Sequence, residues 1–105
     1  MNRPSRMSRA DHEVKNRTIK LLVHLLKGKY QKDLRSNSWK ATIREQRRQL
    51  NYIFNDSVSL FNKAVQDMDS LYGDAELETG LPAESFARTN PFNIQLMLQD
   101  DFWPD

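Results

Sequence analysis

The sequence predicts an all-α protein, a small bundle of three longer helices followed by one or two short C-terminal helices. Apolar residues recur at three- and four-residue steps along three stretches, which is the period of an amphipathic helix. No stretch alternates apolar and polar residues for long, so strands have little support. The length of 105 residues limits the chain to one domain. We expect residues 1–8 to form a disordered basic tail and residues 9–105 a single helical domain.

The first predicted helix covers about residues 9–31. Ser8 with Asp11 three residues later resembles a capping box, which marks a helix start. The apolar face that follows is rich in leucine. A glycine in a helix interior costs roughly 1 kcal/mol relative to alanine. We therefore expect the last turn, after Gly28, to fray or end early.

Two further helices follow a polar, turn-like segment. Ser38 is the expected N-cap of the second helix, on which Trp39 lies in the apolar stripe and is expected in the core. The third helix begins after Asp56 or Ser57 and should stop at Gly80, a residue type that favours the position just past a helix.

The C-terminal segment predicts one more short helix and a docked end. Asn90 as cap and Pro91 as first helical residue place this helix at about residues 91–99. Phe102 and Trp103 then precede Pro104, which prevents helix continuation. We expect the tail to dock through its two aromatic rings.

Charge divides the chain into two unlike halves. Residues 1–50 hold 14 Lys and Arg against 4 Asp and Glu, whereas residues 51–105 hold 2 against 10, so the halves carry +10 and −8. Such asymmetry fits two halves that fold against each other and neutralise, and it equally fits a basic face that binds a partner. Steps of four, three and one residue place four cations on one face of the second helix: Lys40, Arg44, Arg47 and Arg48.

Motifs for chemistry are absent from the sequence. There is no cysteine, and no phosphate-binding, metalloprotease or hydrolase motif. His12 and His24 are too far apart to lie on adjacent helical turns as zinc ligands. We expect no enzyme activity, no catalytic residue, no cofactor and no metal. Without a secretory signal or an apolar run of roughly 20 residues, a cytoplasmic location is expected.

Five ordered segments of the chain resemble the bacterial "domain of unknown function 29" family, common in cyanobacteria: LLVHLLKGKYQ, SWKATIREQRRQL, NDSVSL, LYGDAELETGL and NPFNIQLMLQDDFWPD. The resemblance covers about residues 8–105. It implies a small all-helical protein without established activity, from a bacterium or from something that infects one.

The chain also departs from the family pattern. Family members usually carry a further N-terminal region, so this chain is similar to a form that lacks it. We expect that absence to leave an apolar face open on the first helix, around Leu21, Leu22 and Leu25. The polar residues that match the family pattern fit either a site or a buried network holding two helices in register: His24, Tyr30, Thr42, Glu45 and Gln46.

These observations lead to one functional hypothesis and one alternative. The first is a non-catalytic protein that binds a protein partner or a second copy through the basic helix face and the open apolar face, including as an inhibitor or competitor. The alternative is a nucleic-acid-binding module that uses the Lys40, Arg44, Arg47 and Arg48 row, with charge added by Lys15, Arg17 and Lys20. Neither hypothesis involves a membrane or a small-molecule substrate.

Overall fold

A computed structural model describes residues 8–82, 84, 86 and 90–104. Within these residues there is no strand, and the predicted all-α class is confirmed. The elements in chain order are α1 (Arg9–Tyr30), a 3-10 turn η1 (Lys32–Leu34), α2 (Asn37–Asp56), α3 (Val58–Thr79) and α4 (Ile94–Met97).

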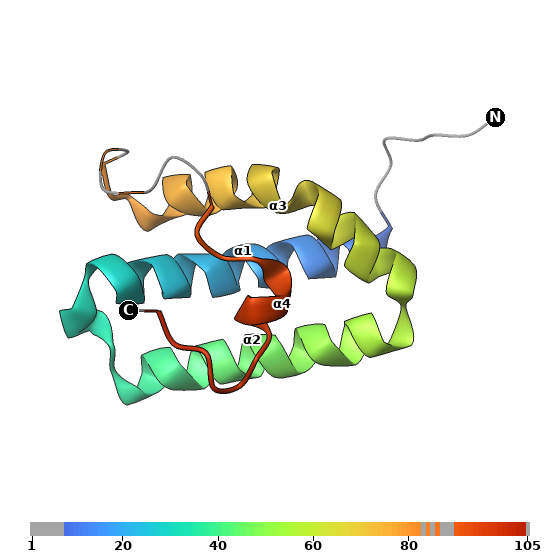
Figure 1. The fold of residues 1–105 in the computed structure, drawn as a ribbon, viewed down its shortest axis with the longest axis horizontal. Coiled ribbons are helices and arrows are strands. Elements are labelled where there is room, and N and C mark those ends of the chain that lie inside the picture. Colours follow the sequence, from blue (N-terminus) through green and yellow to red (C-terminus); the bar gives the residue numbers. More distant parts are fainter. Residues whose placement is uncertain (1–7, 83, 85, 87–89, 105) are drawn as a thin grey trace.

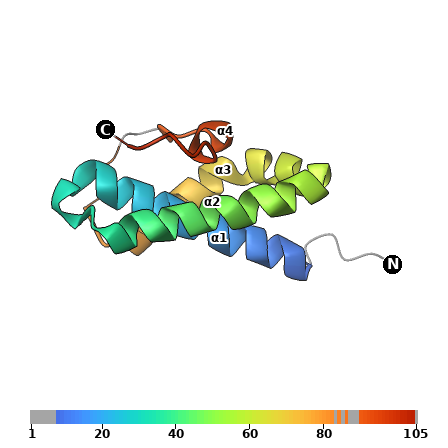
Figure 2. The ribbon, with the colours of Figure 1, turned by 90° about the horizontal axis from the view of Figure 1, so that it is seen from below.

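The three long helices pack into a bundle, and the C-terminal segment covers one side of it. α1 packs against both α2 and α3, which contact each other much less (Figure 1). α4 and the residues after it cross in front of the gap between α2 and α3, on the side away from α1 (Figure 2). A short helix and a tail that turns at residues 98, 100 and 101 therefore lie where many bundles have a fourth helix.

Local capping explains where the long helices begin and end. The Ser8 hydroxyl accepts from the Asp11 amide at 3.1 Å, and the Asp11 carboxylate accepts from the Ser8 amide, so the expected capping box is confirmed. Ser57 caps α3, and Gly80 ends it with a left-handed φ of 72°, as predicted. The predicted cap of α2 is wrong by two residues. Ser36 accepts from the Trp39 amide at 3.1 Å, while Ser38 lies in the first turn and bonds to the Ser36 hydroxyl.

The last helix is shorter than predicted. Asn93, not Asn90, is its cap, with its side-chain oxygen accepting from the Leu96 amide at 2.7 Å. Asn90 instead accepts from the Phe92 amide and holds the turn around Pro91. Phe92 thereby enters the core before the helix starts, which leaves α4 only residues 94–97.

The apolar face of α1 is not open. Leu21, Leu22 and Leu25 are each 0% exposed, because α1 lies between α2 and α3. The expectation that these leucines form an uncovered partner-binding face is therefore wrong. The described residues cover them with the chain's own helices.

Gly28 marks the closest approach between α1 and α2. A Cβ built on Gly28 would lie 2.1 Å from Cζ2 of Trp39, whose indole Nε1 donates to the carbonyl of His24 at 2.7 Å. Trp39 is buried, as expected. The last turn of α1 does not end early as predicted, since the helix continues to Tyr30 with this indole packed against it. The indole of Trp39 thus leaves no room for a side chain at position 28, so glycine fits there despite its low helix propensity.

Replacing this glycine should cost stability, while a matched glycine should gain from the same change. We expect Gly28→Ala to lower the free energy of unfolding by about 1–3 kcal/mol, because the methyl group overpacks against Trp39. Gly73→Ala in α3, where a Cβ meets nothing within 4 Å, should raise it by about 0.5–1 kcal/mol through helix propensity. Urea unfolding followed by circular dichroism measures both. Equal effects of the two substitutions would contradict the packing described.

Candidate functional site

The candidate site is the face of α2 that contacts the C-terminal tail, residues 97–104. Arg47 lies at the centre of this face and is 0% exposed. Its Nε donates to the carbonyl of Met97 at 2.6 Å, its Nη2 to that of Phe102 at 2.5 Å, and its Nη1 to that of Asp100 at 3.5 Å. One guanidinium thus binds three main-chain carbonyls of a six-residue segment.

Two more side chains extend this contact along the tail. Asn51, one turn further along α2, donates from Nδ2 to the carbonyl of Leu98 at 3.2 Å. Arg35, in the segment before α2, donates to the carbonyl of Pro104, and its Nε donates to the carbonyl of Gly28 at 2.7 Å. Arg47, Asn51 and Arg35 therefore bind five main-chain carbonyls of residues 97–104. Arg35 also links the end of α1 to the end of the tail.

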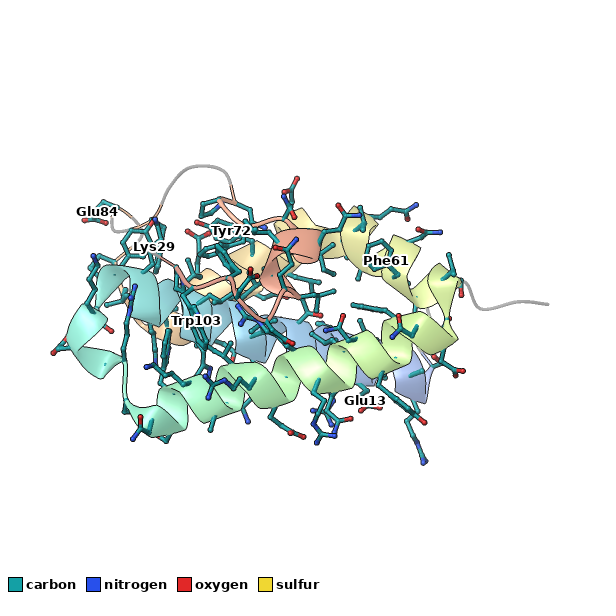
Figure 3. The ribbon with its side chains drawn as sticks, turned by 60° about the horizontal axis from the view of Figure 1, so that its bottom comes forward. Glu13, Lys29, Phe61, Tyr72, Glu84 and Trp103 are labelled. Atoms are coloured by element: carbon teal, nitrogen blue, oxygen red, sulfur yellow. The ribbon has the colours of Figure 1, made fainter. Side chains whose placement is uncertain are left out.

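Aromatic packing completes the docking of the tail, as predicted. The Trp103 ring lies against Trp39, with 5.7 Å between centroids, beside α2 (Figure 3). The guanidinium carbons of Arg44 and Arg47 lie 5.6 Å and 5.1 Å from the Trp103 ring centroid, within cation–π range. Pro104 is buried beside them. The tail is therefore fixed by rings as well as by carbonyl contacts.

Burial of Arg47 removes it from the predicted partner-binding row. Desolvation lowers the pKa of its guanidinium, and the carboxylates of Asp100 and Asp101 oppose this shift. An arginine stays charged in proteins, so its burial is costly unless its donors are bonded. The exposed position predicted for Arg47 is wrong, because Arg47 lies four residues after Ile43 and three before Leu50, both fully buried. That spacing was the sequence signal for an inward side chain.

The other three predicted cations, Lys40, Arg44 and Arg48, remain exposed at four-residue steps along α2. Two hollows meet at Arg44. The first, of about 330 Å³, is also lined by Arg35, Trp39, Lys40 and Trp103. The second, of about 710 Å³, is also lined by Arg48, Asn51, Tyr52, Asn55 and Asp100. We call the two hollows together the α2 groove; it follows the basic row, and the tail residues Asp100 and Trp103 form part of its wall.

The predicted polar residues do not form one buried network. Gln46 alone gives a contact between helices, since its Oε1 accepts from Arg17 at 3.1 Å. Glu45 is exposed and accepts from Arg48 and Gln49 on its own helix, and these hydrogen bonds lower the pKa of its carboxyl.

The remaining members of that set lie apart. The ring Nδ1 of His24 lies 2.8 Å from the carbonyl of Lys20. Tyr30 packs edge-on against Phe86, and Thr42 is half-buried in α2. These residues therefore make separate local contacts. Of the predicted network, the hydrogen bond between Arg17 and Gln46 is the contact that joins two helices.

Three ion pairs in the described part of the chain are local. Arg17 pairs with Glu13 at 2.9 Å, Arg48 with Glu45 at 2.8 Å and Lys63 with Asp67 at 2.8 Å. Each pair joins residues of one helix, so none of these three neutralises the basic half with the acidic half. Exposed pairs of this kind stabilise a protein by less than about 1 kcal/mol.

A model of a protein family described as "Domain of unknown function DUF29" matches residues 5–103, nearly the whole chain. The chain belongs to the DUF29 family. In this DUF29 chain the matched region contains α2, Arg35 and the tail through Trp103. No curated protein and no solved structure matches the sequence.

Neither a metal site nor a membrane-spanning helix occurs among the described residues. Among them, no group of three or more histidine or acidic residues is placed to hold a metal ion. No helix formed by those same residues is both long enough and apolar enough to cross a bilayer.

Neighbouring arginines of α2 provide a matched test of the tail contact. Arg47→Met leaves three carbonyls without a donor, and we expect it to lower the free energy of unfolding by about 1–3 kcal/mol. It should also raise the quenching of tryptophan fluorescence by acrylamide, because Trp103 loses its anchor. Arg48→Met, at an exposed site, should change stability by less than about 0.5 kcal/mol and leave quenching unchanged. A tail held independently of Arg47 would give the same result for both variants.

Proposed function

We propose that this DUF29 chain is a non-catalytic interaction module that binds an acidic segment of a protein partner in the α2 groove. The observation that carries the proposal is the exposed row of Lys40, Arg44 and Arg48 beside two hollows that meet at Arg44. The lining consists of cationic, amide and aromatic side chains with one carboxylate, a set suited to holding an anionic chain.

The spacing of the row suits an extended polypeptide. Four helical residues rise about 6 Å, so the three cations span about 12 Å. Alternate residues of an extended chain lie about 6.6 Å apart on the same side. An extended segment with acidic residues at alternate positions therefore places its carboxylates close to successive cations of the row.

Charge and length favour a protein segment over nucleic acid. Three exposed cations are fewer than the roughly six to ten phosphate contacts of strongly salt-dependent DNA binders. The burial of Arg47 removes the fourth cation on which the nucleic-acid alternative depended.

Charge reversal on α2 and on α1 tests the proposal with fluorescently labelled polyglutamate as the probe. We expect wild-type chain to raise the probe's fluorescence anisotropy at low salt and to lose this binding near about 0.5 M salt, where charges are screened. Lys40→Glu with Arg44→Glu should weaken binding by about 10-fold or more, equivalent to about 1.4 kcal/mol. The control, Lys15→Glu with Lys20→Glu, makes the same charge change on exposed positions of α1 and should retain binding.

Two outcomes would overturn this proposal. Equal weakening by both double variants would show attraction by net charge without a site on α2. Binding of a single-stranded DNA oligonucleotide through the same two residues, without binding of polyglutamate, would replace it with the nucleic-acid alternative. Urea unfolding of each variant excludes loss of fold as the cause.

A further inference from the structure

The tail that lies along the α2 groove is itself an acidic and aromatic peptide, since Asp100 and Asp101 directly precede Phe102 and Trp103. We propose that the face of α2 covered by the tail, together with the adjoining α2 groove, is a binding site for acidic–aromatic peptide segments, and that the chain's own tail, residues 98–104, is its displaceable intramolecular occupant. This inference rests on the proposed function and specifies the partner segment that the groove accepts.

The first support is that side chains on α2 and just before it hold the main chain of the tail. Arg47, Asn51 and Arg35 all donate to backbone carbonyls. Carbonyls are present at every position of any peptide, so these contacts place few demands on sequence. The tail turns at residues 98, 100 and 101, where the Phe102 amide donates to the Gln99 carbonyl at 3.1 Å. A second chain that adopts the same turns offers the same acceptors.

The second support is that Trp39, Arg44 and Arg47 together form a binding place for one large aromatic ring. Trp103 packs on Trp39 and lies near the guanidinium groups of both Arg44 and Arg47, while Pro104 is buried next to it. Tryptophan supplies a large contact area and the strongest cation–π partner among the aromatic residues. Ring recognition here selects an aromatic residue near the end of the bound segment.

The third support is charge complementarity immediately before the ring. Asp100 lines the hollow that also contains Arg44 and Arg48, and both Asp100 and Asp101 act electrostatically on Arg47 to favour its charged form. Both aspartates are exposed. An acidic pair followed by aromatic residues therefore meets first the cations of α2 and then the Trp39 platform.

The fourth support is the way the tail is attached. Residues 80–93 separate α3 from α4, and the described part of this stretch contains no α-helix or strand. Phe92, Ile94 and Met97 are buried in the core, whereas Phe102 and Trp103 are only half-buried and Pro104 is the one fully buried side chain of residues 98–104. Residues 98–104 can therefore leave α2 while the apolar anchors before them stay in place.

A covalently attached occupant competes strongly with one from solution. A short flexible connection gives effective concentrations in the millimolar range. We therefore expect a free peptide to bind the wild-type chain weakly and to bind tightly once the attached tail is weakened.

The test uses the full-length chain and a fluorescein-labelled peptide with the sequence of residues 98–105, LQDDFWPD. Trp103→Ala in the chain removes the ring of the attached tail, and we expect it to tighten peptide binding by about 10-fold or more in fluorescence anisotropy, equivalent to about 1.4 kcal/mol. Leu77→Ala, at an exposed apolar side chain of α3, is the matched control and should leave peptide binding unchanged. Peptides LQDDFAPD and LQNNFWPD should each bind the Trp103→Ala chain more weakly than LQDDFWPD.

A second measurement covers the case in which Trp103→Ala fails to fold. Wild-type chain labelled with 5-fluorotryptophan has two fluorine signals, from Trp39 and Trp103. Excess LQDDFWPD should move the Trp103 signal towards its solvent-exposed position, whereas LQDDFAPD should not. Peptide affinity equal for wild-type and Trp103→Ala chains, or an unmoved Trp103 signal where that variant does not fold, would overturn the inference.

The polyglutamate experiment and the LQDDFWPD experiment distinguish failure of the proposed function from failure of this inference. Polyglutamate binding through Lys40 and Arg44 without any binding of LQDDFWPD would leave the proposed function standing and remove the tail-site inference. Binding of LQDDFWPD without polyglutamate binding would retain the site and show that carbonyl and ring contacts, not the exposed cation row, hold the partner.

Discussion

A buried positive charge sets the arrangement of residues 97–102. The guanidinium of Arg47 is removed from water, and such a group costs several kcal/mol unless its donors find acceptors. Its acceptors are carbonyls of residues 97, 100 and 102, so the tail has to pass over α2 at this point. That path places the tail over the seam between α2 and α3, where the described residues form no fourth long helix (Figure 2).

The same path depends on the packing at the end of α1. Gly28 lets Trp39 lie against α1, and Trp39 in turn supports the ring of Trp103. Arg35 binds the carbonyls of both Gly28 and Pro104, which ties the end of the first helix to the end of the tail. The exposed cations of α2 border this assembly, so the proposed binding face and the tail form one continuous surface.

The parts of the fold that depend on local sequence were predictable, and the parts that depend on distant contacts were not. The Ser8 capping box, the Ser57 cap and the Gly80 stop each involve residues a few positions apart, so sequence patterns reveal them. Whether Leu21, Leu22 and Leu25 are covered depends on how α2 and α3 pack, which periodicity alone leaves open. Arg47 follows the core spacing of Ile43 and Leu50, yet its charge favours an exposed assignment.

Arg35 and Asn51 had no sequence signal as tail-binding residues. Their acceptors are main-chain carbonyls 69 and 47 residues away, and a carbonyl carries no side-chain signature. The docking of Phe102 and Trp103 was predictable because large rings near a chain end favour burial, but their position on Trp39 and Arg47 was not. Residues that bind main-chain carbonyls of a distant segment can be identified only from the three-dimensional structure.

The measurement that tests this account most directly is the nuclear magnetic resonance signal of the Arg47 Nε–H group in the wild-type chain. A guanidinium buried against carbonyls and rings predicts that the Nε–H resonance of Arg47 exchanges slowly with water and shows nuclear Overhauser contacts to protons of Phe102 and Trp103. Fast exchange of the Arg47 Nε–H with no contact to either ring would show that the tail is not held by Arg47, and would contradict the account.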